Sequence, residues 1–265
     1  MIKIFKKFWY LLTQIYLTFF CAFFYYLKIK KITKLKKLNI HIIKKILLDK
    51  NIEKLWTKFK KKQKKIYFAS NSGGVNIKDQ KLFFFLISFY KPKKILEIGT
   101  HLGHSLNSMA CAKSYNNLKN TSIHTVDIYD VNKINRYVND SKVYSPKKIL
   151  SENKVYNKIK FIKSGSDNFF NKNKINYDLI FIDGNHTINQ VLKDTINSLN
   201  CLNKNGIIIL HDYYEIRNIK DIFKKIYGPF FALKIIKFKL NNLRIIKLSE
   251  VGGLLKNNTT LVILN

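Results

Sequence analysis

The sequence predicts an α/β fold, a parallel sheet covered by helices on both faces, preceded by a basic helical appendage. From residue 93 onward, apolar strand-like runs alternate with helical stretches, an order that implies a right-handed crossover between successive parallel strands. Polar residues stand where these apolar runs end, and ligands bind at that edge in open α/β sheets. At 265 residues, the chain can form one such domain, assigned to residues 66–265, with an appendage at residues 1–65.

The appendage begins with an uncharged run at residues 8–27 that is bracketed by lysines. About 20 apolar residues suffice for a helix that spans a bilayer, although Thr13, Gln14 and Thr18 weaken the match. No small-residue cleavage site follows the run, which disfavours a cleaved signal peptide. Three interpretations stay open: an anchor that spans or lies on a membrane, a buried N-terminal helix, and a contact in a homo-oligomer.

Residues 28–65 carry a lysine-rich amphipathic pattern. Leucines and isoleucines recur at three- and four-residue steps between residues 35 and 47, which predicts a helix with one apolar face. Residues 1–65 hold nineteen lysines, against only Asp49 and Glu53 as acids. Such a polybasic helix suits the anionic inner face of a membrane, and the alternative is a solvated lysine face. A loop at residues 70–75 is expected to be the hinge to the domain.

The formal net charge of +33 invites a nucleic-acid or membrane interpretation. However, only Arg136, Arg217 and Arg244 are arginines, whereas nucleic-acid sites favour arginine for bidentate recognition. The abundant lysine, asparagine, isoleucine, phenylalanine and tyrosine all have A/T-rich codons. A biased genome therefore explains part of the charge without any selected partner.

The cysteines Cys21, Cys111 and Cys201 are widely spaced and form no C-x-x-C pair. This usage argues against a disulfide framework and a structural zinc site. It indicates a reducing compartment, so we expect a cytoplasmic protein, with attachment to the inner face of the membrane as an open alternative.

The elements of the domain are expected in the following order. After a helix at residues 79–90 and the opening strand, strands are predicted at residues 122–126, 158–163, 177–182 and 206–210. Helices between them are predicted at residues 105–115, 146–153, 166–171 and 186–199, and a further helix at residues 218–227. Two β-rich runs, at residues 243–248 and 260–264, follow that helix.

The most informative stretch is residues 93–105, K-K-I-L-E-I-G-T-H-L-G-H-S. It predicts a buried strand, a turn with Gly99 and Gly103, and a helix that opens near Ser105. Backbone N–H groups and a helix N-terminus then converge on one point, which suits a small polar ligand. Glu97 would repel a pyrophosphate but suits a ligand with an ammonium group. The glycine spacing also departs from the G-x-G-x-x-G dinucleotide fingerprint.

This stretch resembles the first motif of the class I S-adenosylmethionine-dependent methyltransferases. The resemblance implies that Glu97, Gly99, Thr100, Gly103 and Ser105 hold the methionine end of S-adenosylmethionine. It also implies a Rossmann-like three-layer sandwich with a seven-stranded, mostly parallel sheet. The two C-terminal β-rich runs would then be the hairpin that closes this sheet, with the last strand antiparallel.

Two further strand ends match cofactor positions of that family. The second strand ends V-D-I-Y-D, which places Asp127 at its tip, where a family carboxylate accepts hydrogen bonds from both ribose hydroxyls; the alternative is a surface acid in a turn. The next strand ends K-S-G-S-D-N, which places Ser166 near the adenine. Family members often have Gly-Asp-Ser here, whereas this chain has its acid one step later, at Asp167, where it could cap the next helix.

The motifs I-D-G-N-H and H-D-Y end the fourth and fifth strands. Together they resemble a bacterial branch of small-molecule methyltransferases related to the sugar and catechol O-methyltransferases, over residues 66–265. In these relatives, carboxylates at the two strand ends bind a divalent metal, and Asp183 and Asp212 match them; Asp183 also borders the cofactor. Oxygen ligands suit magnesium, whereas an added His186 or His211 shifts preference toward manganese, iron or zinc. The catechol pattern has Asp-Asn where this chain has Asp212-Tyr213.

His186 or His211 could serve as general base, because a histidine titrates near neutral pH. Alternatively, His186 caps its helix and His211 is a satisfied buried histidine. The expected function is methyl transfer from S-adenosylmethionine to a hydroxyl of a small molecule, sugar or glycoconjugate. Two rivals are an RNA methyltransferase that uses the lysines and a non-catalytic membrane-attached scaffold that retains the fold. The sequence leaves the methyl acceptor and the oligomeric state open.

Overall fold

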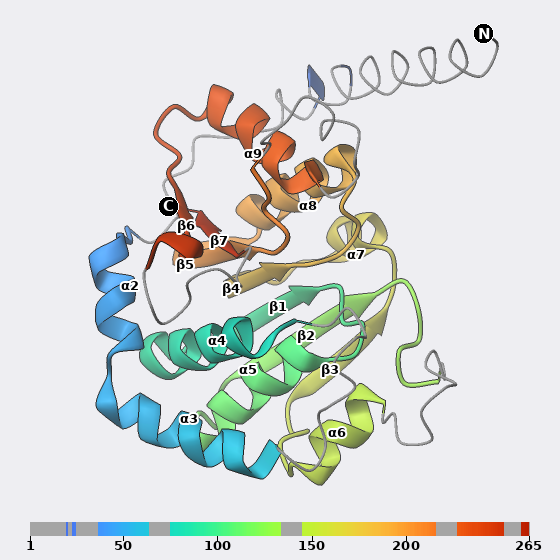
Figure 1. The fold of residues 1–265 in the computed structure, drawn as a ribbon. Helices are drawn as coiled ribbons and strands as arrows, with labels where there is room; N and C mark the ends of the chain where they lie inside the picture. Colours follow the sequence, from blue (N-terminus) through green and yellow to red (C-terminus); the bar gives the residue numbers. More distant parts are fainter. Residues whose placement is uncertain are drawn as a thin grey trace, which may run out of the picture.

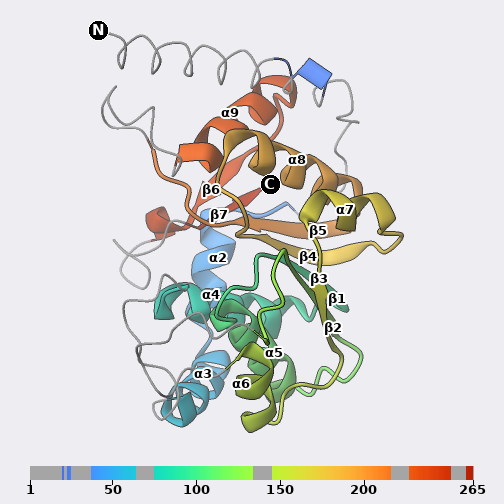
Figure 2. The same ribbon diagram turned by 90° about the vertical axis from the view of Figure 1, so that its right-hand side faces the viewer.

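The computed structural model describes residues 20, 23–24, 37–63, 75–133, 145–215, 227–251 and 261–264. These residues form a seven-stranded sheet in the order β3-β2-β1-β4-β5-β7-β6, between two layers of helices (Figures 1 and 2). The strands are β1 (Lys94–Ile98), β2 (Ser122–Asp127), β3 (Ile159–Lys163), β4 (Tyr177–Ile182), β5 (Leu202–Leu210), β6 (Ile245–Lys247) and β7 (Val262–Leu264).

The described helices follow the predicted order between residues 77 and 200, but the last one begins at residue 228, after the end of the helix predicted at residues 218–227. They are α2 (Ile40–Leu47), α3 (Lys50–Gln63), α4 (Ile77–Tyr90), α5 (His104–Tyr115), α6 (Pro146–Glu152), α7 (Ser166–Lys172), α8 (Ile188–Asn200) and α9 (Gly228–Lys239). A 3-10 turn, η3 (Leu248–Val251), follows β6. Short turns join β1 to α5 and β4 to α8, so both helices start directly at the carboxyl edge of the sheet.

Strand pairing confirms the predicted topology. The pairs β3-β2, β2-β1, β1-β4 and β4-β5 are parallel, whereas β7 is antiparallel to both β5 and β6. The central strands are apolar on both faces because helices cover both sides, as parallel sheets require. The Rossmann-like sandwich that the sequence predicted, with an antiparallel closing hairpin, is therefore confirmed.

Successive side chains along each strand point to opposite faces of the sheet and so contribute to two separate hydrophobic cores. In β1, Ile95 packs with α4 and α5, whereas Leu96 and Ile98 pack with α8 and α9 on the opposite face. Glu97 shares the face of Ile95, toward α5. This alternation decides where the Glu97 carboxylate lies relative to the ligand edge.

The N-terminal helices differ from the prediction of one amphipathic helix. Helix α2 ends at Leu47, and a second helix, α3, follows. The Asp49 carboxylate accepts hydrogen bonds from the backbone N–H groups of Asn51 and Ile52 and so caps the start of α3. The apolar faces of α2 and α3 are buried in the same core as α4, with Trp56 at 5.5 Å from Phe84 between ring centroids. Residues 37–63 thus pack on the sandwich, and the division at residue 65 stays a prediction.

Several expectations fall outside the described residues. These are most of the apolar run at residues 8–27, the loop at residues 70–74 and most of the helix at residues 218–227. In that run only Phe20, Phe23 and Phe24 are described, and all three are exposed. Among the described helices, none has the length and apolar character needed to cross a bilayer.

Candidate active site

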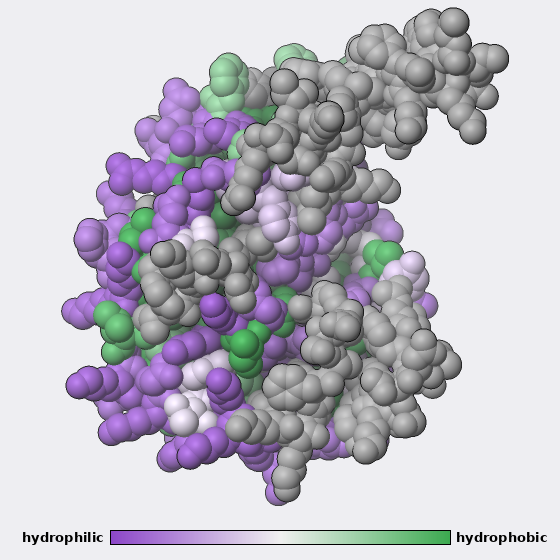
Figure 3. Space-filling model, in the orientation of Figure 1, coloured by the Kyte–Doolittle hydropathy of each residue, from purple (hydrophilic) through white to green (hydrophobic). Residues whose placement is uncertain are grey.

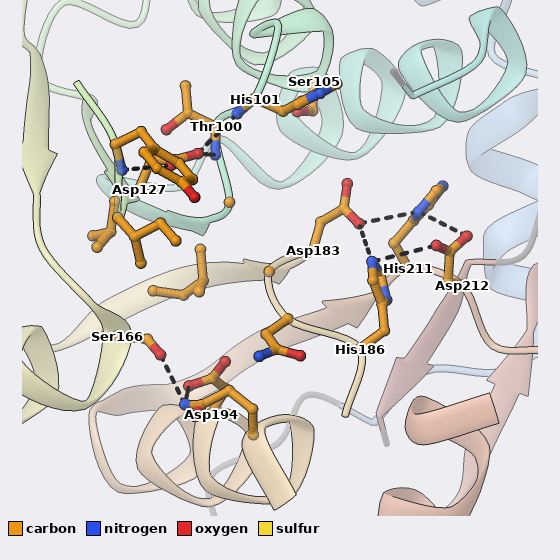
Figure 4. Close-up of a pocket in the computed structure, with 18 of the residues that line it drawn as sticks. Thr100, His101, Ser105, Asp127, Ser166, Asp183, His186, Asp194, His211 and Asp212 are labelled. Carbon is orange, nitrogen blue, oxygen red and sulfur yellow. Dashed lines mark hydrogen bonds and ion pairs between the residues drawn. The ribbon is translucent and has the colours of Figure 1, made fainter. Parts of the chain in front are cut away.

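A cavity of about 1110 Å³ opens at the carboxyl edge of the sheet. Most of its lining residues come from five segments that follow neighbouring strands, at residues 98–105, 126–129, 164–168, 183–186 and 211–214, and Val75, Asn76, Gln190 and Asp194 complete the lining. All five parallel strands end at this edge, so their polar tips meet there. Figure 4 shows these residues, with the Asp127 side at one end and the Asp183 side at the other.

The turn after β1 depends on its two glycines. Gly99 has φ +93°, and a Cβ at this position would lie 2.1 Å from the carbonyl oxygen of Asp183. Gly103 has φ +74°, and its Cβ would lie 2.8 Å from Cβ of Pro146. Only glycine accepts both the backbone conformation and the close approach. The turn can therefore bring backbone atoms against the end of β4.

Glu97 lies beneath this turn and does not line the cavity. Its side chain is fully buried, with one oxygen accepting from Ser105 Oγ and the other from Thr125 Oγ1, both at 2.5 Å. Burial raises the pKa of the Glu97 carboxyl to about 8, although these two hydrogen bonds act in the opposite direction. The geometry therefore gives Glu97 a supporting position under the turn, where the sequence led us to expect direct contact with the ligand, whereas Ser105 donates to Glu97 and also borders the cavity.

Asp127 lines the cavity, as expected, and it also holds the glycine turn. Its Oδ2 accepts from the backbone N–H groups of Thr100 and His101, both at 3.1 Å, and its Oδ1 accepts from the N–H of Tyr129 at 2.9 Å. A carboxylate offers about four lone-pair sites, so Asp127 keeps some acceptor capacity toward the cavity.

Ser166 belongs to a polar cluster that sequence patterns did not reveal. The Nε2 group of Gln190, on α8, lies 2.9 Å from Ser166 Oγ, 3.1 Å from Asp167 Oδ1 and 3.0 Å from Asp194 Oδ1. Burial raises the pKa of Asp194 to about 6, although hydrogen bonds from Ser166 and Gln190 lower it. Gln190 and Asp194 lie within helix α8. A search for polar residues at the ends of strands therefore does not find them.

At the other end of the cavity, the two predicted acids and the two predicted histidines come together (Figure 4). Nδ1 of His211 lies 3.1 Å from Oδ1 of both Asp183 and Asp212. Nε2 of His186 lies 3.5 Å from Asp212 Oδ2 and 3.9 Å from Asp183 Oδ1. His186 does not cap α8, because Thr187 takes that role through its side-chain oxygen.

A third acid completes this cluster from below. Asp79, on α4, is fully buried, and its Oδ2 lies 3.5 Å from Nε2 of His211. Burial alone would lower the pKa of His211, but the contacts with Asp183, Asp212 and Asp79 outweigh it and raise this pKa to about 12. The pKa of Asp212 is lowered, because His211 and His186 outweigh the effect of its burial. No sequence motif pointed to Asp79.

The backbone at Asp212 is unusual for a residue with a side chain. Its φ of +55° lies in the left-handed region, which is uncommon outside glycine. Strained residues of this kind cluster at functional sites, where the surrounding structure holds them in place. Here the bend follows β5 directly and places the Asp212 carboxylate beside His186 and His211.

The donor set at this end fits a divalent metal ion. Asp183, His186 and Asp212 each offer one ligand atom, and these atoms lie within 4.8 Å of one another. Two carboxylates and one imidazole suit manganese, iron or zinc, and the carboxylates alone suit magnesium. Both acids expected as metal ligands are thus close enough to share an ion.

The known proteins and the family model that this chain resembles are methyltransferases. Residues 96–213 match the model of a family described as a methyltransferase domain. The O-methyltransferase from Bacillus cereus in complex with SAH has a similar structure, with a TM-score of 0.54 at 14% identity, over 82% of this chain and 90% of that one. TomG from Streptomyces achromogenes, an O-methyltransferase of tomaymycin synthesis in complex with SAM, gives 0.52 at 13% identity, over 82% and 89%. No curated protein matches the sequence significantly.

Proposed function

We propose that the chain transfers a methyl group from S-adenosylmethionine to a hydroxyl of a small molecule, sugar or glycoconjugate, since residues 96–213 match a methyltransferase-domain model and the sheet has the Rossmann-like order. One observation carries the proposal. A single cavity joins a glycine turn with Asp127 at one end to a cluster of acids and histidines at the other. A methyl donor and an acceptor hydroxyl need these two kinds of surroundings side by side.

The cofactor end fits the parts of S-adenosylmethionine. Asp127 faces the cavity with spare acceptor capacity for ribose hydroxyls, and Gly99, Thr100 and Gly103 border the space for the methionine part. Ser166 borders the side where the adenine would lie. Buried Glu97 supports the turn from below through Ser105 and Thr125. Bound S-adenosylmethionine supplies an activated methyl group, so the protein has to align the acceptor and take up its proton.

At the acceptor end, His186 is better placed than His211 to remove a proton. Both ring nitrogens of His211 face carboxylates, and its side chain is only 15% exposed. The side chain of His186 is 32% exposed and borders the cavity. We assign His186 the role of general base and His211 the role of orienting Asp183 and Asp212.

The same cluster would hold a divalent metal through Asp183, Asp212 and the imidazole of His186. Such an ion would lower the pKa of an acceptor hydroxyl, and His186 would then be a ligand. The two assignments of His186 make opposite demands. A base needs an unprotonated ring nitrogen directed at the acceptor hydroxyl, whereas a ligand needs Nε2, which faces both carboxylates, directed at the ion. Metal binding by the purified protein therefore separates them.

The exposed lysines of α2 and α3 support a second, independent proposal, association with an anionic membrane surface. The apolar sides of α2 and α3 are buried, so the lysines of these helices point outward. The surface over the two helices is mainly hydrophilic (Figure 3). The exposed lysines are Lys44, Lys45, Lys50, Lys54, Lys58, Lys60, Lys61 and Lys62. Co-sedimentation with vesicles that contain phosphatidylserine, and not with neutral vesicles, is the expected result. Equal binding to RNA and vesicles would leave only non-specific charge attraction.

Calorimetric titration of the full chain with S-adenosylmethionine tests the central proposal. The wild type should bind, and Asp127→Asn should bind at least about tenfold more weakly, because hydrogen bonds to a charged group contribute about 1.5–3 kcal/mol. If the wild type shows no binding, the proposal fails. Incubation with a panel of phenols, catechols and sugars, followed by detection of S-adenosylhomocysteine, then identifies the acceptor class. Binding without turnover of any acceptor would favour the scaffold, and methylation of RNA would favour the RNA enzyme.

A further inference from the structure

We propose that Asp79 is a positioning residue of the acceptor end, which holds the His211 ring so that its Nδ1 stays between Asp183 and Asp212. This inference rests on the proposed function of the same cluster. It assigns a role to a residue of α4, an element that none of the recognisable motifs includes. Asp79 itself borders no part of the cavity.

The contacts form a chain from α4 to the cavity. Oδ2 of Asp79 lies 3.5 Å from Nε2 of His211, and Nδ1 on the other side of the ring lies 3.1 Å from both Asp183 and Asp212. Those two carboxylates in turn lie 3.9 Å and 3.5 Å from Nε2 of His186. The His211 ring is therefore held from both sides, and Asp79 is the part of this chain furthest from the cavity.

The burial of Asp79 needs an explanation that helix capping does not supply. Asn76 is the N-cap of α4, and its Nδ2 donates to Asp79 Oδ2 at 2.6 Å, an ordinary contact within the first helical turn. Such a cap works equally well at the surface, where an acid is well solvated. Asp79 is instead 0% exposed, and its Oδ1 accepts no hydrogen bond from the described residues. Burial of a carboxylate is costly unless a polar partner compensates it, and Nε2 of His211, at 3.5 Å from Oδ2, is the partner from outside the helix.

Loss of Asp79 would release one side of the ring. Nε2 of His211 would then lack its acceptor, and the ring could turn about its Cβ–Cγ bond away from Asp183 and Asp212. The cofactor end would be little affected, because Asp127 and the glycine turn hold it through separate hydrogen bonds. The expected defect is therefore local to the acceptor end.

The test compares three variants of the full chain. Asp79→Leu has a similar size and no acceptor, whereas Asp79→Asn keeps an oxygen that can accept from Nε2. Asn76→Ser is the matched control, because serine keeps the N-cap acceptor but removes the Nδ2 contact with Asp79. The chain has six histidines, so the ring C–H resonances can be assigned by single His→Gln changes in a carbon–proton spectrum.

We expect the His211 ring resonance to shift or broaden in Asp79→Leu, to shift less in Asp79→Asn and to stay in place in Asn76→Ser. Affinity for S-adenosylmethionine should stay at the wild-type value in both Asp79 variants, because Asp79 borders no part of the cavity. An unchanged His211 resonance in Asp79→Leu, or an equal shift in Asn76→Ser, would overturn the inference and leave capping as the role of Asp79. If Asp79→Leu does not fold, the comparison of Asp79→Asn with Asn76→Ser decides by the same criteria. The wild-type titration tests the methyl-donor proposal separately, so the two failures are distinguishable.

Discussion

The carbonyl oxygen of Asp183 lies only 2.1 Å from the position that a Cβ would take at Gly99. This contact joins the turn after β1 to the end of β4, and so the cofactor end of the cavity to its acceptor end. The two ends are therefore fixed relative to each other by backbone packing, before any ligand binds.

Gly99→Ala should destabilise the protein by several kcal/mol, since a side chain at φ +93° costs about 1–3 kcal/mol and the clash with Asp183 adds to it. Urea unfolding measures the change. Gly165→Ala is the matched control, because no atom lies within 4 Å of its Cβ position, and it should change stability by no more than about 1 kcal/mol. Equal effects of the two changes would contradict the close approach of Gly99 to Asp183.

Glu97→Gln should change how stability depends on pH. The pKa of Glu97 is raised to about 8 in the folded protein, so between about pH 4.5 and pH 8 the folded state holds a proton that the unfolded state releases. Stability from this group is thus present at low pH and is lost as pH rises, with a slope of at most about 1.4 kcal/mol per pH unit.

Urea unfolding at several pH values, compared between wild type and Glu97→Gln, checks this sign. The difference between the two proteins should shift in favour of the variant as pH rises from 5 to 8 (roughly the window over which the buried group ionises). Parallel curves would mean that Glu97 is accessible to solvent.

His211→Gln should destabilise the folded protein strongly, because removal of the partner of buried acids typically costs about 3–5 kcal/mol. His186→Gln, at a more exposed position on the same cluster, should cost less than about 1 kcal/mol. Thermal unfolding of both variants at pH 7 measures the contrast. A larger effect of His186→Gln would show that the cluster is held together differently.

His186→Ala should lower methyl transfer to an identified hydroxyl acceptor by about 10²–10⁴-fold, the usual contribution of a general base. Binding of S-adenosylmethionine should be unchanged, because His186 lies at the other end of the cavity. Single-turnover assays and calorimetry separate the two quantities. Retained turnover would exclude His186 as the base.

Manganese should bind to the wild type and should bind much more weakly to Asp183→Asn and Asp212→Asn, because both carboxylates lie within sharing distance of one ion. Electron paramagnetic resonance of free manganese measures the binding directly. Asp167→Asn, an acid on the opposite side of the cavity, serves as the control and should bind as the wild type does.

The sequence alone determined the class of fold and which residues stand at the strand ends. Apolar runs that alternate with helical stretches are local signals, and so are a glycine turn after a strand and an acid at a strand tip. Asp127, Asp183, His186, His211 and Asp212 could all be found in this way. The positions of the helices from α4 to α8 followed from the same periodicity, whereas α9 was not predicted.

Only the tertiary structure decided how these residues are used. Strand alternation turns Glu97 away from the cavity, sheet order brings the ends of β4 and β5 together, and the packing of α4 places Asp79 under His211. The break at Asp49 and the burial of Trp56 likewise placed α2 and α3 on the core. Distances between residues far apart in the chain depend on strand order and packing, and pKa values depend on burial. Neither is encoded in a local pattern, so the motif residues were visible in the sequence while their partners were not.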